Sequence, residues 1–178
     1  MEKDMKKILI TEDQIQNKIK ELAVEINEDY KNKELLMLCI LKGSIVFMGD
    51  LMKRISLYST IDFMSLSSYG NSITSSGSVK ILKDLDSSVE GKDVLIVEDI
   101  IDTGITLKYV CEYLRNKGAK SVEIVTLLDK PSGRKVEIEA KYTGFEVGNE
   151  FVIGYGLDYA EKYRNLPYIG VLNESVYK

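Results

Sequence analysis

Apolar residues near the start of the chain recur at a helical period. They predict a helix over residues 12–30, with Ile15, Ile19, Leu22, Ala23 and Ile26 on one face. The residues just before this stripe, Thr11 to Gln14, have the spacing of a capping box, in which a hydroxyl and an amide side chain satisfy free backbone groups. The sequence therefore predicts both the helix and its first residue.

Continuous apolar runs predict strands that are covered on both faces. The runs over residues 34–41 and 93–99 are the clearest. The other predicted strands cover residues 58–70, 79–85 and 121–129, with shorter strands around 142–147, 151–154 and 168–172. Helices are predicted over residues 43–55 and 106–118, the second closed by Gly118.

The alternation of strands and helices predicts an α/β fold with a central parallel sheet and right-handed crossovers. The length, 178 residues, suits a single domain over 1–178. No repeat, linker or low-complexity tail divides the chain. The first helix and the C-terminal strands are left to form a smaller lobe.

Composition narrows the function classes. The net charge of -4 argues against a nucleic-acid partner, which needs a basic face. No apolar run approaches the ~20 residues that span a bilayer, and the N-terminus lacks a secretory apolar region, so a soluble, cytoplasmic protein without a membrane partner is expected. The chain has no histidine, which excludes histidine-based catalysis and histidine metal ligands. Cys39 and Cys111 are predicted to be buried, reduced thiols.

The strand predicted over 93–99 ends in two adjacent acids, Glu98 and Asp99, and a third acid, Asp102, follows shortly. No basic residue lies among them, so three carboxylates repel one another over a short stretch. In a parallel sheet, ligands bind beyond the carboxyl ends of the strands. These acids therefore lie where a binding site is expected.

The turn after these acids has the features of an anion site. It consists of Asp102, Thr103, Gly104, Ile105 and Thr106. Free amides where a helix begins bind phosphate, the threonine hydroxyls add donors, and Gly104 allows close approach. A ligand with a phosphate, vicinal hydroxyls and a divalent cation would satisfy both the turn and the acids. The alternative left open is that Asp102 and Thr103 only cap the helix, with Glu98 and Asp99 as solvated loop acids.

A second candidate anion site follows the strand over 34–41. There Gly43 and the start of a helix offer amides, and Lys42 adds a positive charge; an ordinary strand-to-helix turn is the alternative. The Ser- and Gly-rich segment 65–80 has the composition of a flexible linker. Neither a P-loop motif nor a dinucleotide-binding glycine motif is present.

The stretch Val94–Leu107, VLIVEDIIDTGITL, resembles the phosphoribosyl-diphosphate (PRPP) binding motif of type I phosphoribosyltransferases. Its Asp-Thr-Gly form is characteristic of the members that act on 6-oxopurines. The resemblance runs over nearly the whole chain, which is identified as a member of the bacterial hypoxanthine (hypoxanthine-guanine) phosphoribosyltransferases. It implies the type I phosphoribosyltransferase fold, in which a central parallel sheet flanked by helices carries a small hood lobe, here from the N-terminal segment and roughly 130–178, and a flexible active-site loop.

The resemblance implies a reaction in purine salvage. The 5-phosphoribosyl group of PRPP passes to hypoxanthine, and to guanine, with Mg²⁺, giving IMP or GMP and pyrophosphate. By the same resemblance, residues 102–106 bind the 5′-phosphate and Asp102 is the general base. Glu98 and Asp99 bind the ribose. Lys42, Gly43 and Arg164 bind pyrophosphate, often beside a cis peptide between Leu41 and Lys42.

The remaining implied site residues bind the base and the metal. Lys130 donates to the purine 6-oxygen, with Arg134 as a further donor, and the purine contacts Phe151, Val152 and Asp158. Mg²⁺ is held by Glu98, Asp99 and Asp158. Ser68 and Tyr69 belong to the loop that folds over the site during reaction.

One position departs from part of the family: Ile105 stands where some members, including mammalian ones, have a basic residue. Two alternatives stay open. The enzyme could prefer another base such as xanthine, or the chain could be a non-catalytic regulator of the same fold that binds nucleotides or RNA. The intact Lys42, Asp102 and Arg164 and the acidic pI near 5.1 make RNA regulation the weaker case. Family habit suggests a homodimer or homotetramer.

Overall fold

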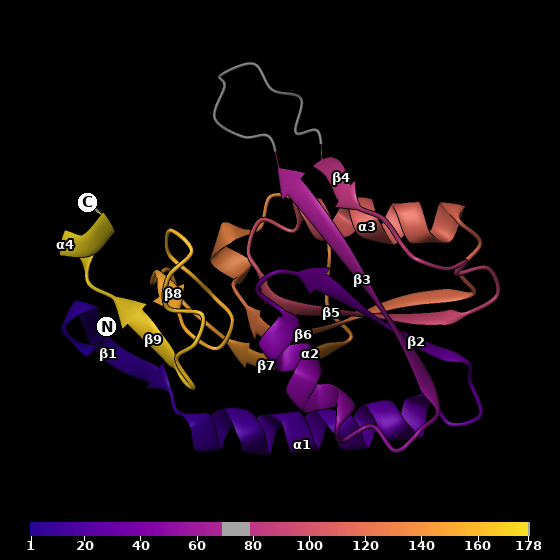
Figure 1. Ribbon diagram of the computed structural model, residues 1–178, viewed down its shortest axis with the longest axis horizontal. Coiled ribbons are helices and arrows are strands. Elements are labelled where there is room, and N and C mark those ends of the chain that lie inside the picture. The colour runs from indigo at the N-terminus through magenta and orange to yellow at the C-terminus, as the bar shows by residue number, and fades with distance from the viewer. Residues whose placement is uncertain (69–78, 178) are drawn as a thin grey trace.

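The computed structural model describes residues 1–68 and 79–177 (Figure 1). Its larger sheet has six strands in the order β4-β3-β2-β5-β6-β7. These are β2 (Leu35–Leu41), β3 (Ser59–Ser68), β4 (Val79–Lys83), β5 (Asp93–Ile101), β6 (Ser121–Asp129) and β7 (Tyr142–Glu146). Neighbouring strands are parallel except β4, which runs antiparallel to β3 at one edge. The prediction of an α/β fold with a central parallel sheet is confirmed.

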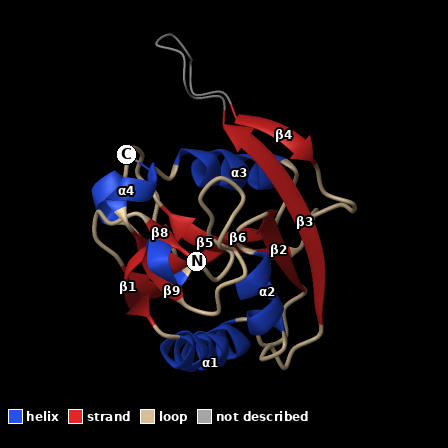
Figure 2. Cartoon of the chain, turned by 60° about the vertical axis from the view of Figure 1, so that its left-hand side comes forward, coloured by secondary structure: helices blue, strands red, loops and turns tan. Residues whose placement is uncertain are grey.

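Helices cover both faces of this sheet. Helices α1 (Glu12–Asp29) and α2 (Ile45–Met52) lie on one face and α3 (Ile105–Asn116) on the other (Figures 1 and 2). Successive residues of β2 point to opposite faces, so Met37 packs with α1 and α2 while Leu36 and Leu38 pack with α3. This two-sided burial explains the continuous apolar runs of the central strands. No helix among the described residues is long and apolar enough to cross a membrane.

The helix ends follow the local signals in the sequence. Thr11 and Gln14 form the predicted capping box, with the Gln14 amide 3.3 Å from Thr11 Oγ1 and the Thr11 amide 2.9 Å from Gln14 Oε1. Gly118, at φ 86°, follows the end of α3 as predicted. Helix α2 is shorter than the predicted 43–55, because residues 42–44 form the turn that leads into it and a turn at residues 53–54 follows its last residue, Met52.

A second, three-stranded sheet lies beside the first, in the order β1-β9-β8. It consists of β1 (Met5–Ile10), β8 (Val152–Ile153) and β9 (Ile169–Leu172), all antiparallel, and it brings the two ends of the chain to the same side of the molecule (Figure 1). Strand β1 was not predicted, nor were the 3-10 turns η1 (Glu2–Asp4) and η2 (Pro131–Gly133) or the short helix α4 (Glu174–Tyr177). Half of the residues of strand β1 are exposed and the strand pairs irregularly with β9, so its formation depends on a distant partner rather than on local pattern.

The strand order creates a crevice at the carboxyl ends of β2 and β5. From β2 the chain continues to β3 on one side, and from β5 it continues to β6 on the other. Strands β2 and β5 are therefore the neighbours at which the winding direction changes, and ligands bind outside such a switch point. The two candidate anion-binding turns both leave the sheet here.

Candidate active site

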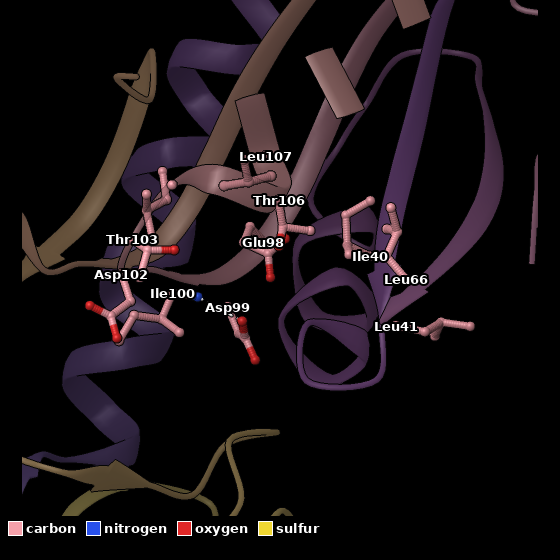
Figure 3. A pocket seen from close by; sticks show the side chains of 12 residues that line it. Ile40, Leu41, Leu66, Glu98, Asp99, Ile100, Asp102, Thr103, Thr106 and Leu107 are labelled. Carbon is pink, nitrogen blue, oxygen red and sulfur yellow. Dashed lines mark hydrogen bonds between the residues drawn. The ribbon is translucent and has the colours of Figure 1, made fainter. Parts of the chain in front are cut away.

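A cavity of about 310 Å³ opens at this switch point (Figure 3). Its polar walls come from the end of β5 and from the following turn, and Ile40, Leu41 and Leu66 close the opposite side. The predicted site residues that line it are Glu98, Asp99, Asp102, Thr103, Gly104 and Thr106. The structure therefore brings together the predicted ribose and phosphate residues, except Ile105, which begins α3 outside this lining.

Glu98 and Asp99 place two carboxyl groups side by side at the edge of the core. Asp99 is 9% exposed and Glu98 is partly buried. Burial, together with the charge of Asp99, raises the pKa of Glu98 well above its ordinary value, and burial also raises the pKa of Asp99. The Ile100 amide, 2.7 Å from Asp99 Oδ1, offsets part of this cost. The pair would gain from a cation or from hydroxyl donors.

The turn after β5 leaves helix amides available to a ligand. The N-cap of α3 is Gly104, at φ 78°, which has no side chain to cap the helix. Thr103 Oγ1 accepts only a long hydrogen bond, 3.4 Å, from the Ile105 amide. A Cβ on Gly104 would also lie 2.5 Å from Ile138 Cγ2, so both the positive φ and the close packing favour glycine here. The alternative in which Asp102 is only a helix cap is not supported by this geometry.

The turn after β2 lies against the acids. The peptide bond between Leu41 and Lys42 is cis. Gly43 follows, and a Cβ at Gly43 would lie 1.7 Å from Asp99 Oδ2, so any larger residue there would displace that carboxylate. The predicted pyrophosphate turn is thus in direct contact with Asp99, one of the two predicted ribose acids.

A loop from the C-terminal part of the chain completes this end of the crevice. Gly156 packs on the Gly43 carbonyl and accepts a hydrogen bond, 2.8 Å, from Arg164 Nη1. Arg164 Nη2 lies 2.9 Å from Asp158 Oδ1. Glu161 contacts both predicted pyrophosphate cations, Lys42 and Arg164. Sequence reasoning missed Glu161, because an acid in a polar loop carries no local signal of such contacts.

Lys130 and Arg134 lie beside the third acid. The Lys130 amide donates to the Ile101 carbonyl at 2.9 Å, and Arg134 Nη1 donates to the Asp102 carbonyl at 3.0 Å. Arg134 also forms an ion pair with Asp129. The predicted base-recognition lysine therefore leaves β6 next to the predicted general base.

Phe151 and Val152 lie on the smaller sheet and do not line the cavity at the switch point. Val152 is buried in β8, opposite Val171. Phe151, 37% exposed, stacks on Tyr177 at 5.1 Å between ring centroids and meets Tyr159 edge-on. Ser68 is the last residue of β3, whereas Tyr69 and the rest of the predicted active-site loop up to residue 78 lie outside the described residues.

The donor set suits a hard cation better than a transition metal. Among the described residues, no group of three or more acids or cysteines converges as a metal site. Two neighbouring carboxyl groups with raised pKa values remain, and Mg²⁺ is usually held by one or two carboxylates together with water and substrate phosphates. The residues present fit a magnesium ion that arrives with an anionic substrate.

Comparison with known proteins decides the family. A family model described as the phosphoribosyl transferase domain matches residues 11–160. The chain belongs to the phosphoribosyltransferase family. The resemblance recognised in the Val94–Leu107 motif is therefore confirmed.

Relatives within this phosphoribosyltransferase family match the whole chain. The hypoxanthine-guanine phosphoribosyltransferase of Bacillus subtilis is 59% identical over 178 residues, which are 100% of this chain and 99% of the relative. The Staphylococcus aureus (strain Mu50) enzyme of the same name is 56% identical over 177 residues, 99% of each chain. A crystal structure of a Staphylococcus aureus hypoxanthine phosphoribosyltransferase superposes with a TM-score of 0.97 at 56% identity, covering 100% of this chain and 97% of that one. The type I phosphoribosyltransferase fold is thereby confirmed.

Replacing Gly43 by Ala should abolish most transferase turnover while the protein stays folded. The added Cβ would meet the Asp99 carboxylate at 1.7 Å and push it from its place. A displacement of about 1 Å in a catalytic site can cost roughly 100-fold in rate. Turnover and melting temperature should be measured together. Gly49→Ala is the matched control, because nothing lies within 4 Å of its added Cβ; similar turnover in both variants would contradict the packing argument.

Replacing Glu98 by Gln should stabilise the ligand-free protein at neutral pH. Because folding raises the pKa of both carboxyls, folded stability falls as pH rises from the unfolded towards the folded pKa. Removing one charge should raise the melting temperature at pH 7 by about 2–4 °C, with a smaller gain below pH ~3, where both groups are largely protonated in either state. Exposed Glu25→Gln is the control. A lower melting temperature for Glu98→Gln at pH 7 would refute the unfavourable pairing.

Proposed function

We propose that this protein transfers the 5-phosphoribosyl group of PRPP to hypoxanthine, and to guanine, releasing pyrophosphate and the nucleoside monophosphate. The observation that carries the proposal is the convergence of Glu98, Asp99 and the 102–106 turn in one cavity at the switch point. This convergence occurs in a chain 59% identical over its full length to a hypoxanthine-guanine phosphoribosyltransferase.

PRPP would lie along the crevice between β5 and β2. Its 5′-phosphate would accept hydrogen bonds from the amides and hydroxyls of residues 102–106, at the positive end of the α3 dipole. The ribose hydroxyls would donate to Glu98 and Asp99, and the pyrophosphate would lie at Lys42 and Gly43, with Arg164 on its far side. The contact between Gly43 and Asp99 supports this order, because it puts the pyrophosphate turn next to the ribose acids.

The base would be recognised beside Asp102. Lys130 would donate to the purine 6-oxygen, which favours oxopurines because the 6-amino group of adenine cannot accept this bond. Phe151 would stack on the purine, and the Val152 backbone and Asp158 would complete its surroundings. These four roles come from the family resemblance; the position of Lys130 next to the Asp102 segment supports the first.

The chemistry requires charge stabilisation and removal of one proton. Positive charge grows on the anomeric carbon as pyrophosphate leaves, and the carboxylates of Glu98 and Asp99 would stabilise it. Asp102 would accept the proton from N7 of the base as the new bond forms. Lys42 and Arg164 would neutralise the departing pyrophosphate.

Asp158 would hold one Mg²⁺, and Glu98 and Asp99 would bind the ribose hydroxyls directly or through the metal. When bound, it would neutralise charge on the pyrophosphate oxygens and fix their positions. Asp158 is already paired with Arg164 at 2.9 Å, so these two residues could share the anion and its cation.

Residues 1–178 would form one domain, with the hood made by the N-terminal segment and residues roughly 130–178, and Ser68 and Tyr69 would belong to a loop that excludes water from the reacting centre. We also propose that the protein is a homodimer or homotetramer. We place it in the cytoplasm, a reducing compartment in keeping with its two free, buried cysteines.

A pyrophosphate-release assay tests the function. The protein should be incubated with PRPP, Mg²⁺ and hypoxanthine, guanine, xanthine, adenine or uracil in turn. We expect release with hypoxanthine and guanine and none with adenine or uracil. Release with xanthine alone would change the substrate, and no release with any oxopurine would overturn the proposal.

Asp102→Asn should reduce turnover by about 10²- to 10⁴-fold, the usual contribution of a general base. Asparagine keeps the size of the side chain but cannot take up a proton, so the variant should still bind IMP. Turnover by rapid quench and IMP binding by calorimetry separate the two effects. A variant with normal turnover would rule out Asp102 as the base.

A further inference from the structure

Glu161 contacts Lys42 and Arg164, the two side chains that would bind pyrophosphate in the proposed function. Its Oε2 lies 3.1 Å from Lys42 Nζ, and its Oε1 lies 3.4 Å from Arg164 Nη2. Lys42 follows β2, whereas Arg164 belongs to the loop before β9. One carboxylate thus bridges cations from two distant parts of the chain.

The backbone holds Glu161 at the tip of a tight turn. Tyr159 and Lys162 exchange two backbone hydrogen bonds, at 3.2 and 3.0 Å, and Ala160 and Glu161 between them have φ values of 51° and 63°. A two-residue turn with both φ values positive normally contains Asn and Gly, so Ala and Glu are disfavoured here. The Glu161 amide, 2.8 Å from Asp158 Oδ2, helps to hold the turn. A disfavoured conformation that is kept in place often marks a functional position.

The contacts of Glu161 are suited to exchange. Its side chain is 65% exposed and that of Lys42 is 67% exposed, so water screens their attraction. Arg164 is more buried and has a second partner in Asp158. An incoming polyanion could therefore replace Glu161 as the partner of Lys42 and Arg164 without first breaking a buried ion pair.

We propose that Glu161 is an internal counter-ion, which bridges Lys42 and Arg164 in the ligand-free enzyme and is displaced when the pyrophosphate group of PRPP binds between them. The inference rests on the proposed function for the identity of the anion. Glu161 holds the two cations near each other before binding, weakens binding by competition, and returns to them as pyrophosphate leaves. It determines affinity for this group, not for the purine.

Titration calorimetry with inorganic pyrophosphate and Mg²⁺ tests the competition directly. The full chain is compared with Glu161→Gln and Glu161→Ala. Both variants should bind pyrophosphate about two- to tenfold more tightly, the range expected from losing competition by the exposed pair with Lys42 and the partly buried pair with Arg164. The gain should shrink as ionic strength rises. Glu21→Gln is the matched control, because Glu21 is 61% exposed and paired with Lys18; its affinity should equal that of the wild type.

Steady-state kinetics separate this role from a structural one. The KM for PRPP should fall in both Glu161 variants, whereas the KM for hypoxanthine should not change. Unchanged or weaker pyrophosphate binding in Glu161→Gln would overturn the proposal and make Glu161 a residue that only positions Lys42 and Arg164. If the wild type transferred no ribosyl group to any base, the proposed function would fail, and the pyrophosphate titration would still decide the role of Glu161.

Discussion

Glu98 and Asp99 are neighbouring carboxyl groups at the boundary between the core and the switch-point cavity, and burial raises both of their pKa values. Neither forms an ion pair with another described residue; the nearest direct partner of Asp99 is the adjacent Ile100 amide. Such a pair costs stability in the ligand-free protein, because each charge is desolvated beside the other. The Ile100 amide offsets part of that cost, and a ligand with hydroxyl groups or a cation would offset more, so we expect stability and function to oppose each other here.

The surrounding elements keep Glu98 and Asp99 at the crevice, where a ligand can reach them. Strand β5 is covered by α2 on one face and α3 on the other, and this packing holds its end at the crevice (Figure 2). The turn after β2 reaches the carboxylate only because Gly43 has no side chain. The turn after β5 offers free amides because Gly104 is the N-cap of α3. Two candidate anion-binding turns therefore flank two acids, an arrangement that suits a phosphorylated sugar.

The sequence predicted those parts of the molecule whose structure depends on neighbouring residues. The capping box at Thr11, the two-sided strands β2 and β5 and the turn that leads into α3 all have local signals, and the structure has each of them. Strand β1 escaped prediction because it pairs with β9 at the other end of the chain. The bridge from Lys42 through Glu161 to Arg164 has the same origin, since its residues are joined only by the fold. The family resemblance supplied Arg164 and Lys130, which pattern alone did not distinguish from surface residues.

The central claim is that the acids of β5 and the two flanking turns bind one PRPP molecule. A crystal structure of the protein with PRPP and Mg²⁺, without a base, tests it most directly. The account predicts the 5′-phosphate at the amides of residues 103–106, the ribose hydroxyls at Glu98 and Asp99, and the pyrophosphate between Gly43 and Arg164. A ribose turned away from both acids, with its phosphate bound outside the 102–106 turn, would contradict the account.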